Sequence, residues 1–417
     1  IRRYTALDGK AIAESFADDR IRFCNVRGND LYHQRRSYED GELLFLVNSS
    51  LSDTATGSVG LPAGELVELD AVTGDMRPYP HTADGKSVGA DFSLPPAGSL
   101  LLSEQTGDWK QVRHNYLETL TQMFVDRWAK PMSAYCDRKG MLWTGHYWEH
   151  DWPSMYQGGD NMAMYAWHQM PAIDMLFNQY NDQSPQAQFG NVRAVKELRS
   201  AANQTGCVRT LSETYGGGGW DETFRDFKRL GDWEYALGVN FMNQHLSHMT
   251  IAGARKYDYP PVFTRLSPWW EDYKVLNDYF ARLSLVLSQG EQMNDILVLE
   301  PTTTIWLYYS YVMNDPRCME IGSAFQRFVT TAEYDLGSEN IIKDRGSVRG
   351  GKFVVGKRAY AKVVIPPMTE NLNAGTFSLI RQFVEAGGQL VLFAQPTLVD
   401  GRPSPELADF LDRNASR

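Results

Sequence analysis

The chain has 417 residues, of which 43% are hydrophobic and 22% charged, and its formal net charge is -10. This length has room for two or three domains, each with its own core. The acidic balance and the lack of a lysine or arginine cluster argue against nucleic acid or an anionic membrane as partners. No apolar run is long enough to cross a bilayer, so we expect no membrane span.

The N-terminal residues Ile1–Tyr4 are neither a starting methionine nor a signal peptide, so the sequence leaves the compartment open. The cysteines are far apart and form no Cys-x-x-Cys pair. This spacing argues against a disulfide framework and against a structural zinc site. The four residues are Cys24, Cys136, Cys207 and Cys318.

Residues 1–107 are predicted to form a β-sandwich accessory domain. Short apolar runs alternate here with turn sequences such as Thr73-Gly-Asp75. Short strands at this spacing are typical of a β-sandwich. The expected strands are Arg22–Val26, Leu43–Val47, Glu65–Leu69 and Ser99–Leu102.

Residues 108–294 alternate between helical and strand patterns, which predicts a parallel sheet covered by helices. The expected helices are Asn115–Lys139 with an interruption at Pro131, Asn161–Gln169, Val192–Asn203, Asp221–Leu237 and Trp269–Gln289. The expected strands are Met141–Tyr147, Ile173–Asn178, Val208–Glu213 and Val239–His245. This order is that of a (β/α) barrel, whose active site lies at the C-terminal ends of the strands. Because only four or five such strands occur instead of eight, we expect a partial barrel within an α/β fold.

Residues 295–417 are predicted to form a small doubly wound α/β domain. A helix is expected at Thr376–Ala386, before Gly387-Gly388. No Gly-x-Gly-x-x-Gly turn occurs, so no nucleotide is assigned to it. The expected strands are Ile296–Leu299, Phe353–Val355, Ala361–Ile365 and Gln389–Phe393.

Two glutamates lie where strands of the predicted barrel end. Glu149 lies in the aromatic segment Trp143–Trp152, and Glu213 ends an apolar run before a glycine stretch. Aromatic surroundings exclude water, which raises the pKa of a carboxyl group and suits a general acid. Glycoside hydrolysis needs one protonated and one ionised carboxyl group across the scissile bond. We therefore predict that Glu149 and Glu213 are catalytic and face one pocket. The alternative is two glutamates in structural hydrogen-bond networks.

Aromatic, amide and imidazole side chains near these glutamates suit a carbohydrate ligand, because sugar rings stack on aromatic faces and sugar hydroxyls need hydrogen-bond partners. Aromatic residues make up 12% of the chain, although a well-packed core would also use them. The predicted substrate-binding residues are His146, Trp148, His150, Tyr215, Asn243, His245, Trp269 and Trp270.

The segment His146–His150 also matches His-x-x-Glu-His, the inverted zinc-peptidase signature. That motif needs a helix, which places both histidines on one face. Gly145 precedes the segment and Asp151-Trp-Pro153 follows it, so a strand and a loop are favoured over a helix. A zinc hydrolase that uses His146 and His150 remains an alternative.

Three motifs together, Thr144–Pro153, Leu211–Gly216 and Gly238–His245, resemble large bacterial glycoside hydrolases of the α-L-rhamnosidase type, glycoside hydrolase family 106. The resemblance spans about residues 108 to 310. It implies a (β/α) barrel, carboxylate catalysis with inversion and an active-site calcium ion. It also implies that Glu149 is the acid and Glu213 the second carboxylate. This chain has Gln244 and His245 where a further carboxylate would be sought, so the residues leave retention or inversion open.

The first hypothesis is therefore a glycosidase that cleaves plant or microbial oligo- or polysaccharide, most similar to an α-L-rhamnosidase. Such a function favours a periplasmic or secreted location. The alternatives are a β-galactosidase-like glycosidase, the zinc hydrolase, and a non-catalytic sugar-binding protein on a barrel relic. The sugar, the linkage and the oligomeric state stay open.

Overall fold

The computed structural model describes residues 21–28, 30–38, 41–62, 65–70, 76–83, 87–105, 109–154, 158–309, 316–329 and 333–414. It separates into two compact units, Ile1–Trp109 and Lys110–Arg417. The three-domain division at 107/108 and 294/295 remains a prediction. Within the described ranges, no helix combines the length and the apolar character that a membrane span requires.

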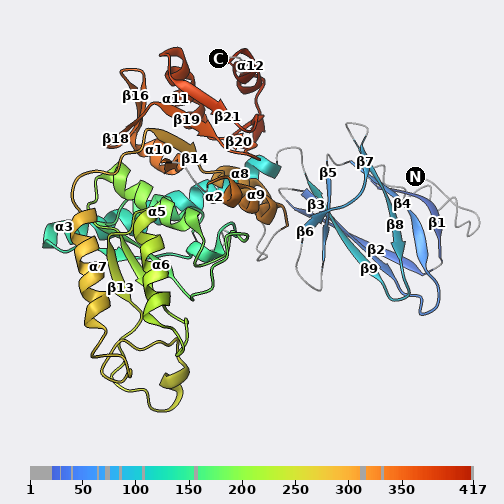
Figure 1. The fold of residues 1–417 in the computed structure, drawn as a ribbon. Helices are drawn as coiled ribbons and strands as arrows, with labels where there is room; N and C mark the ends of the chain where they lie inside the picture. Colours follow the sequence, from blue (N-terminus) through green and yellow to red (C-terminus); the bar gives the residue numbers. More distant parts are fainter. Residues whose placement is uncertain are drawn as a thin grey trace, which may run out of the picture. The chain divides into compact units, whose positions relative to one another are not determined.

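The first unit consists of two antiparallel sheets (Figure 1). The strands of one sheet, in spatial order, are β1 (Arg22–Arg27), β4 (Ala55–Leu61), β8 (Val88–Leu94) and β7 (Thr82–Ala83). Those of the other are β2 (Leu31–Tyr38), β3 (Gly41–Asn48), β9 (Ser99–Gln105), β5 (Glu65–Leu69) and β6 (Met76–Pro78). All four strands predicted for this region are confirmed.

One hydrophobic core joins the two sheets of this unit. In β8, buried and exposed side chains alternate strictly, as expected of a strand with one face against a core. Phe92 of β8 and Val59 of β4 belong to the same buried cluster as Leu46 of β3 and Leu102 of β9. Because side chains of both sheets fill this core, the sheets pack face to face.

The second unit contains a four-stranded parallel sheet, coloured teal to green in Figure 1. Its strands, in spatial order, are β10 (Thr144–Gly145), β11 (Met170–Met175), β12 (Leu211–Thr214) and β13 (Phe241–Gln244). The helices between and after these strands are α4 (Asn161–Tyr165), α5 (Val192–Thr205), α6 (Phe224–Leu237) and α7 (Lys274–Leu287). The predicted alternation of helix and strand is confirmed, and so is the parallel sheet.

Local sequence sets the ends of the two long helices behind this sheet. The Asn191 side chain accepts from the Ala194 amide at the start of α5, and Thr223 opens α6 with a capping box. Gly206, in a left-handed conformation, follows α5, and Gly238 follows α6. The predicted helices Val192–Asn203 and Asp221–Leu237 thus both end at a glycine.

A second parallel sheet follows, coloured orange to red in Figure 1. Its spatial order is β15 (Asp335–Gly337), β14 (Ile296–Leu299), β19 (Lys362–Ile365) and β21 (Gln389–Leu392). The order reverses beside β14, which is the pattern of a doubly wound sheet. Its helices are α8 (Thr302–Tyr308), α9 (Pro316–Phe328), α10 (Glu339–Arg345), α11 (Ala374–Glu385) and α12 (Pro405–Asn414).

Two small sheets complete this part of the chain. They are β16 (Gly346–Arg349), β17 (Lys352–Val355) and β18 (Arg358–Tyr360), and then β20 (Asn371–Leu372), β22 (Leu398–Val399) and β23 (Arg402–Pro403). The predicted strand Phe353–Val355 is part of β17 and so lies outside the parallel sheet. The reason is local: Gly350 and Gly351 both have positive φ and join β16 to β17 by a two-residue hairpin turn.

Helix α5 lies between the two parallel sheets and contacts both β11 and β15. Most of its side chains are therefore buried, including polar ones. Asn203 donates to Asp335 Oδ1 at 2.8 Å, and Gln204 donates to the Leu336 carbonyl at 2.8 Å. These bonds tie the helix to the second sheet.

Two predicted elements differ from the structure. The expected long helix forms as α2 (Trp109–Phe124) and α3 (Lys130–Lys139), joined by a π-helical turn at Val125–Ala129. Pro131 has no N–H for the helical ladder, and it is accommodated in the first turn of α3. The expected strand Met141–Tyr147 is reduced to the two residues of β10.

Candidate active site

A row of polar side chains crosses the first parallel sheet. Asp174 of β11 pairs in register with Glu213 of β12, which pairs with Asn243 of β13. Ser212 and Thr214 point to the opposite face, where both hydroxyls donate to Glu234 on α6. The row therefore lies on the face away from α6, one residue before the C-terminal ends of β11, β12 and β13.

Two histidines lie beside Glu213. His146 Nε2 is 3.7 Å from Glu213 Oε2, and His245 Nε2 is 3.9 Å from Glu213 Oε1. The Glu213 carboxylate raises the pKa of His146 to about 9. In return, His146 holds the pKa of Glu213 below its ordinary value, so Glu213 is ionised at neutral pH. The structure thus brings His146, Glu213, Asn243 and His245 together, as the sequence suggested.

Asp174 was missed from the sequence, although it lay inside a predicted strand. Burial raises the pKa of its carboxyl group to about 6, while the Glu213 pKa is lowered. The available signal was a charged residue within an otherwise apolar strand, Met170–Met175, one strand away from Glu213. Only the register of the two strands shows that the carboxyl groups are neighbours.

Glu149 lies in a 3-10 turn, Glu149–Asp151, and its side chain is almost fully buried, with 1% exposure. Its Oε1 accepts from the Tyr147 amide at 3.0 Å and from the Tyr165 hydroxyl. Burial raises the pKa of Glu149 to about 7, against the opposing effects of Tyr165 and His146. Because His146 interacts electrostatically with both Glu149 and Glu213, it links the two carboxyl groups.

Arg193 of α5 holds the turn that carries Glu149. Its guanidinium donates to the Glu149 carbonyl oxygen at 2.6 Å and also to Glu197, and it lies 4.3 Å from the ring centroid of Trp152. Glu300 Oε1 is 3.8 Å from Arg193 Nη1, and burial raises the Glu300 pKa well above its ordinary value. The buried arginine thus couples the Glu149 turn to α5 and to the end of β14.

The buried Glu149 gives the first testable prediction, which concerns stability. Its pKa is about 7 in the folded protein against an ordinary 4.5, so the folded state binds the proton more tightly than the unfolded state. Wild-type stability should therefore fall as pH rises from about 4.5 to about 7, by roughly 3 kcal/mol for this one group. Glu149→Gln lacks this dependence.

Chemical denaturation at pH 4.5, 6 and 8 measures the effect, with the free energy of unfolding of the variant minus that of wild type as the readout. We expect this difference to rise across the interval and then level off. A difference that does not change with pH would show that Glu149 keeps an ordinary pKa.

Two predicted substrate-binding residues lie elsewhere, and the structure corrects them. Tyr215 is fully buried and its hydroxyl donates to the Phe227 carbonyl at 2.8 Å, because the chain turns over directly after Thr214. Trp269 packs its ring against Phe263 and Phe224, at centroid distances of 5.4 and 5.8 Å. Both belong to an aromatic core cluster and do not join the Glu213 row.

The remaining predicted residues lie at or near the surface. Trp270 is 38% exposed and stacks on Tyr273. His150 lies 3.8 Å from Asp151, and its burial lowers its pKa. Trp148 is 50% exposed and lies beside His150, at a ring distance of 5.5 Å. None of these contacts connects them to Glu213, so a role for them in substrate binding remains a prediction.

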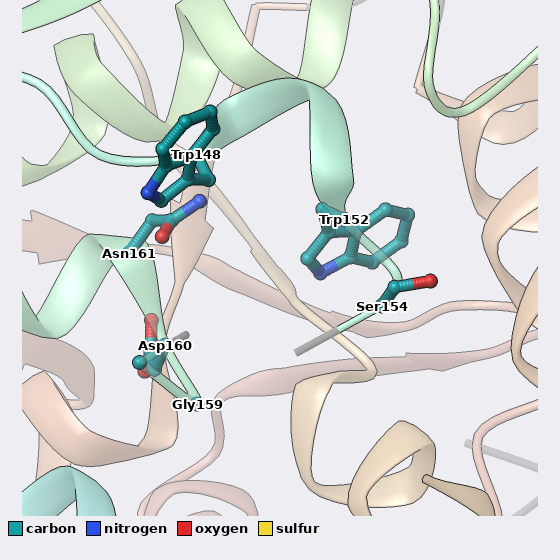
Figure 2. A pocket seen from close by; sticks show the side chains of 7 residues that line it. Trp148, Trp152, Ser154, Gly159, Asp160 and Asn161 are labelled. Carbon is teal, nitrogen blue, oxygen red and sulfur yellow. The ribbon is translucent and has the colours of Figure 1, made fainter. Parts of the chain in front are cut away.

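Trp148 also lines a small pocket, shown in Figure 2. Trp148 and Asn161 lie at one side of it, and Trp152 and Ser154 at the other. Its volume is about 20 Å³. Because ligand pockets usually measure on the order of 300–1,000 Å³, this one has room for a water molecule and not for a sugar ring.

The resemblance implies an active-site calcium ion, and the donor groups at Glu213 allow that to be checked. His146, Asp174 and Glu213 each offer a ligand atom, and these atoms lie within 4.8 Å of one another. Calcium takes about six to eight oxygen ligands, whereas this group offers two carboxylates and one imidazole. These three residues do not fit calcium by themselves, and no catalytic step is assigned to it.

The segment His146–His150 does not form the helix that the zinc hypothesis requires. His146 follows the short strand β10, and His150 lies in the 3-10 turn Glu149–Asp151. Among the described residues, the one group of potential metal ligands that contains His146 does not contain His150. The motif therefore lacks the helical geometry of the zinc peptidases.

Glycoside hydrolases need one protonated and one ionised carboxyl group, and in barrel enzymes these lie near the C-terminal ends of the parallel strands. The sequence model of the α-L-rhamnosidase family, glycoside hydrolase family 106, matches residues 96–410. The chain therefore belongs to this family, and the resemblance that the motifs suggested is confirmed.

The individual proteins that match this chain share low sequence identity with it. A candidate β-glucuronidase of Formosa agariphila is 27% identical over 205 residues, which cover 47% of this chain and 16% of that protein. The rhamnosidase structure from Novosphingobium sp. PP1Y matches with a TM-score of 0.56 and 18% identity, over 75% of this chain and 28% of that one. A family 42 β-galactosidase from G. stearothermophilus matches at a TM-score of 0.47 and 10% identity, over 71% and 43%. The chain spans less than half of each of these proteins.

Proposed function

We propose that this chain carries a glycosidase active site that hydrolyses α-L-rhamnosides in oligo- or polysaccharides, with Glu213 as the ionised carboxylate. The observation that carries the proposal is the set of opposed pKa shifts around His146: the pKa of Glu213 is lowered, and those of Glu149 and Asp174 are raised. Carboxyl groups whose surroundings separate their pKa values are what acid/base cleavage of a glycosidic bond requires.

In this proposal Glu149 donates the proton to the leaving oxygen, and Glu213 acts on the anomeric carbon directly or through a water molecule. Glu149 Oε2 is buried without a hydrogen-bond partner, which leaves one oxygen free to hold a transferable proton. Because Glu149 is 1% exposed, the turn Glu149–Asp151 has to shift before the carboxyl group meets substrate.

Asp174 is the second candidate for the proton donor, and a specific observation favours it. It is only partly buried and lies on the same sheet face as Glu213. One of its carboxylate oxygens lies within 4.8 Å of one of Glu213, which is closer than the roughly 6.5–9.5 Å between the carboxyl groups of inverting glycosidases. The identity of the donor therefore also bears on the stereochemical outcome.

We further propose that β10–β13 are four strands of a (β/α) barrel and that the first unit is a β-sandwich. The sequential parallel order, with α6 behind one face and the polar row on the other, supports the barrel. A groove of about 460 Å³ between β13 and α7 lies at the edge where a further strand would pair.

The pH dependence of kcat/KM on methyl α-L-rhamnoside, whose alkoxide leaving group needs a proton, tests the catalytic proposal. A general acid must be protonated, so activity should fall above about pH 7 if Glu149 is the donor and above about pH 6 if Asp174 is. This fall in activity at high pH should be absent from Glu149→Gln if Glu149 is the donor, and from Asp174→Asn if Asp174 is the donor. Wild-type activity that stays level from pH 5 to 9, or no turnover of any glycoside, would contradict the proposal.

A further inference from the structure

Two aromatic rings pack closely against the glycine-rich turn Gly216–Gly219, which lies shortly after Glu213. A Cβ atom built on Gly217 would lie 2.7 Å from Phe177 Cε1 and 3.1 Å from Tyr259 Cδ1. Phe177 follows β11 and Tyr259 lies in the segment after β13, so the two rings come from distant parts of the sequence. Only a residue without a side chain allows both rings to approach the turn this closely.

Both rings are exposed although they are large and apolar, with exposed fractions of 39% for Phe177 and 46% for Tyr259. Both residues also have positive φ, 63° and 48°, and so does Tyr215 at 82° at the start of the same turn. Bulky residues rarely adopt this conformation, because the Cβ atom crowds the backbone. Such strain persists only where the surroundings enforce it, and it gathers at ligand sites.

A chain of contacts connects these rings to the carboxylate row. The Tyr259 ring lies 6.1 Å from the His245 ring, and His245 Nε2 lies 3.9 Å from Glu213 Oε1. A Cβ atom on Gly216 would lie 3.1 Å from the His245 ring. Tyr259 is therefore one imidazole away from Glu213, and Phe177 lies beside Tyr259 at Gly217.

We propose that Phe177 and Tyr259 bind the leaving group of the substrate and that they select a flat, apolar ring at that position. This inference rests on the proposed function. The sugar that is cleaved needs hydrogen-bond partners for its hydroxyls, which Asp174, Glu213 and Asn243 supply. The neighbouring position offers exposed aromatic faces instead, and these favour a leaving group with a flat, apolar ring over one without a ring, by stacking and burial of apolar area.

The test compares nitrophenyl α-L-rhamnoside, which has an aromatic leaving group, with methyl α-L-rhamnoside, which has none. Tyr259→Ala and Phe177→Ala are each expected to raise KM for the aryl substrate about fivefold or more, with little change in kcat. KM for the methyl substrate should stay within about twofold. Tyr257→Ala is the matched control, because Tyr257 is 81% exposed in the same segment.

Gly217→Ala provides a second variant, because the new methyl group has to displace the Phe177 ring; we expect the same selective rise in KM.

Equal effects of the aromatic variants on both substrates, or none on either, would overturn the proposal. If wild type turns over neither rhamnoside, the proposed function fails by itself. Saturation-transfer NMR with nitrophenyl rhamnoside then decides: binding that Tyr259→Ala weakens supports the aryl site, and no binding, or binding equal in both proteins, overturns it.

Discussion

Replacing Glu213 by glutamine is expected to lower kcat on nitrophenyl α-L-rhamnoside on the order of a thousandfold or more. Glutamine has the same size, but its amide cannot ionise and so can neither attack the anomeric carbon nor activate water. The Glu213 side chain is 28% exposed, and glutamine can still accept a hydrogen bond from His146, so the fold should be retained. The measurement is steady-state kinetics together with the thermal unfolding temperature.

The same variant has a readout that does not depend on activity. The Glu213 carboxylate is the main cause of the raised pKa of His146, so Glu213→Gln should move that pKa from about 9 back toward 6.5. NMR titration of the imidazole protons measures this directly. Glu291→Gln is the matched control, because its side chain is 83% exposed and its carboxylate forms an ion pair with Arg358. Activity of Glu213→Gln at the control level would exclude Glu213 from catalysis.

Replacing Glu149 by glutamine is expected to have an effect that depends on the leaving group. An alkoxide leaves poorly without a proton, so hydrolysis of methyl α-L-rhamnoside should slow by about a hundredfold to ten-thousandfold. Nitrophenolate is a stable anion that departs with little protonation, and the loss on the aryl substrate should be much smaller. The ratio of the two kcat/KM losses is the quantity to measure.

Asp174→Asn is the matched variant for this experiment, because Asp174 is the other carboxyl group with a raised pKa near His146. If the loss in Asp174→Asn depends on the leaving group and the loss in Glu149→Gln does not, Asp174 is the proton donor. Glu149 then has a structural role. Equal losses on both substrates in both variants would mean that neither residue protonates the leaving oxygen.

Much of the fold was predictable, because it depends on local sequence. Gly206 and Gly238 mark helix ends through their backbone freedom, and the short apolar runs Leu43–Val47 and Ser99–Leu102 mark strands. The failures also have local causes. Gly350-Gly351 makes a tight hairpin and removes Phe353–Val355 from the parallel sheet, an effect that apolar periodicity alone does not reveal.

The candidate site was predictable only in part. Glu213, His146 and Asn243 followed from their places at strand ends, because parallel strands bring their C-terminal ends together. Asp174 did not, since its meeting with Glu213 depends on the register between two strands. Tyr215 was misplaced for a similar reason: the turn after Thr214 sends its side chain into the core, which residue type does not disclose.

The central claim is that Glu149 and Glu213 act on the same glycosidic bond, and a double-mutant cycle tests it most directly. Values of kcat/KM for methyl α-L-rhamnoside would be compared among wild type, Glu149→Gln, Glu213→Gln and the double variant. Groups that act as one unit are strongly non-additive, so the double variant should be about as slow as the slower single variant. Losses that multiply, or a single variant with wild-type activity, would contradict the account.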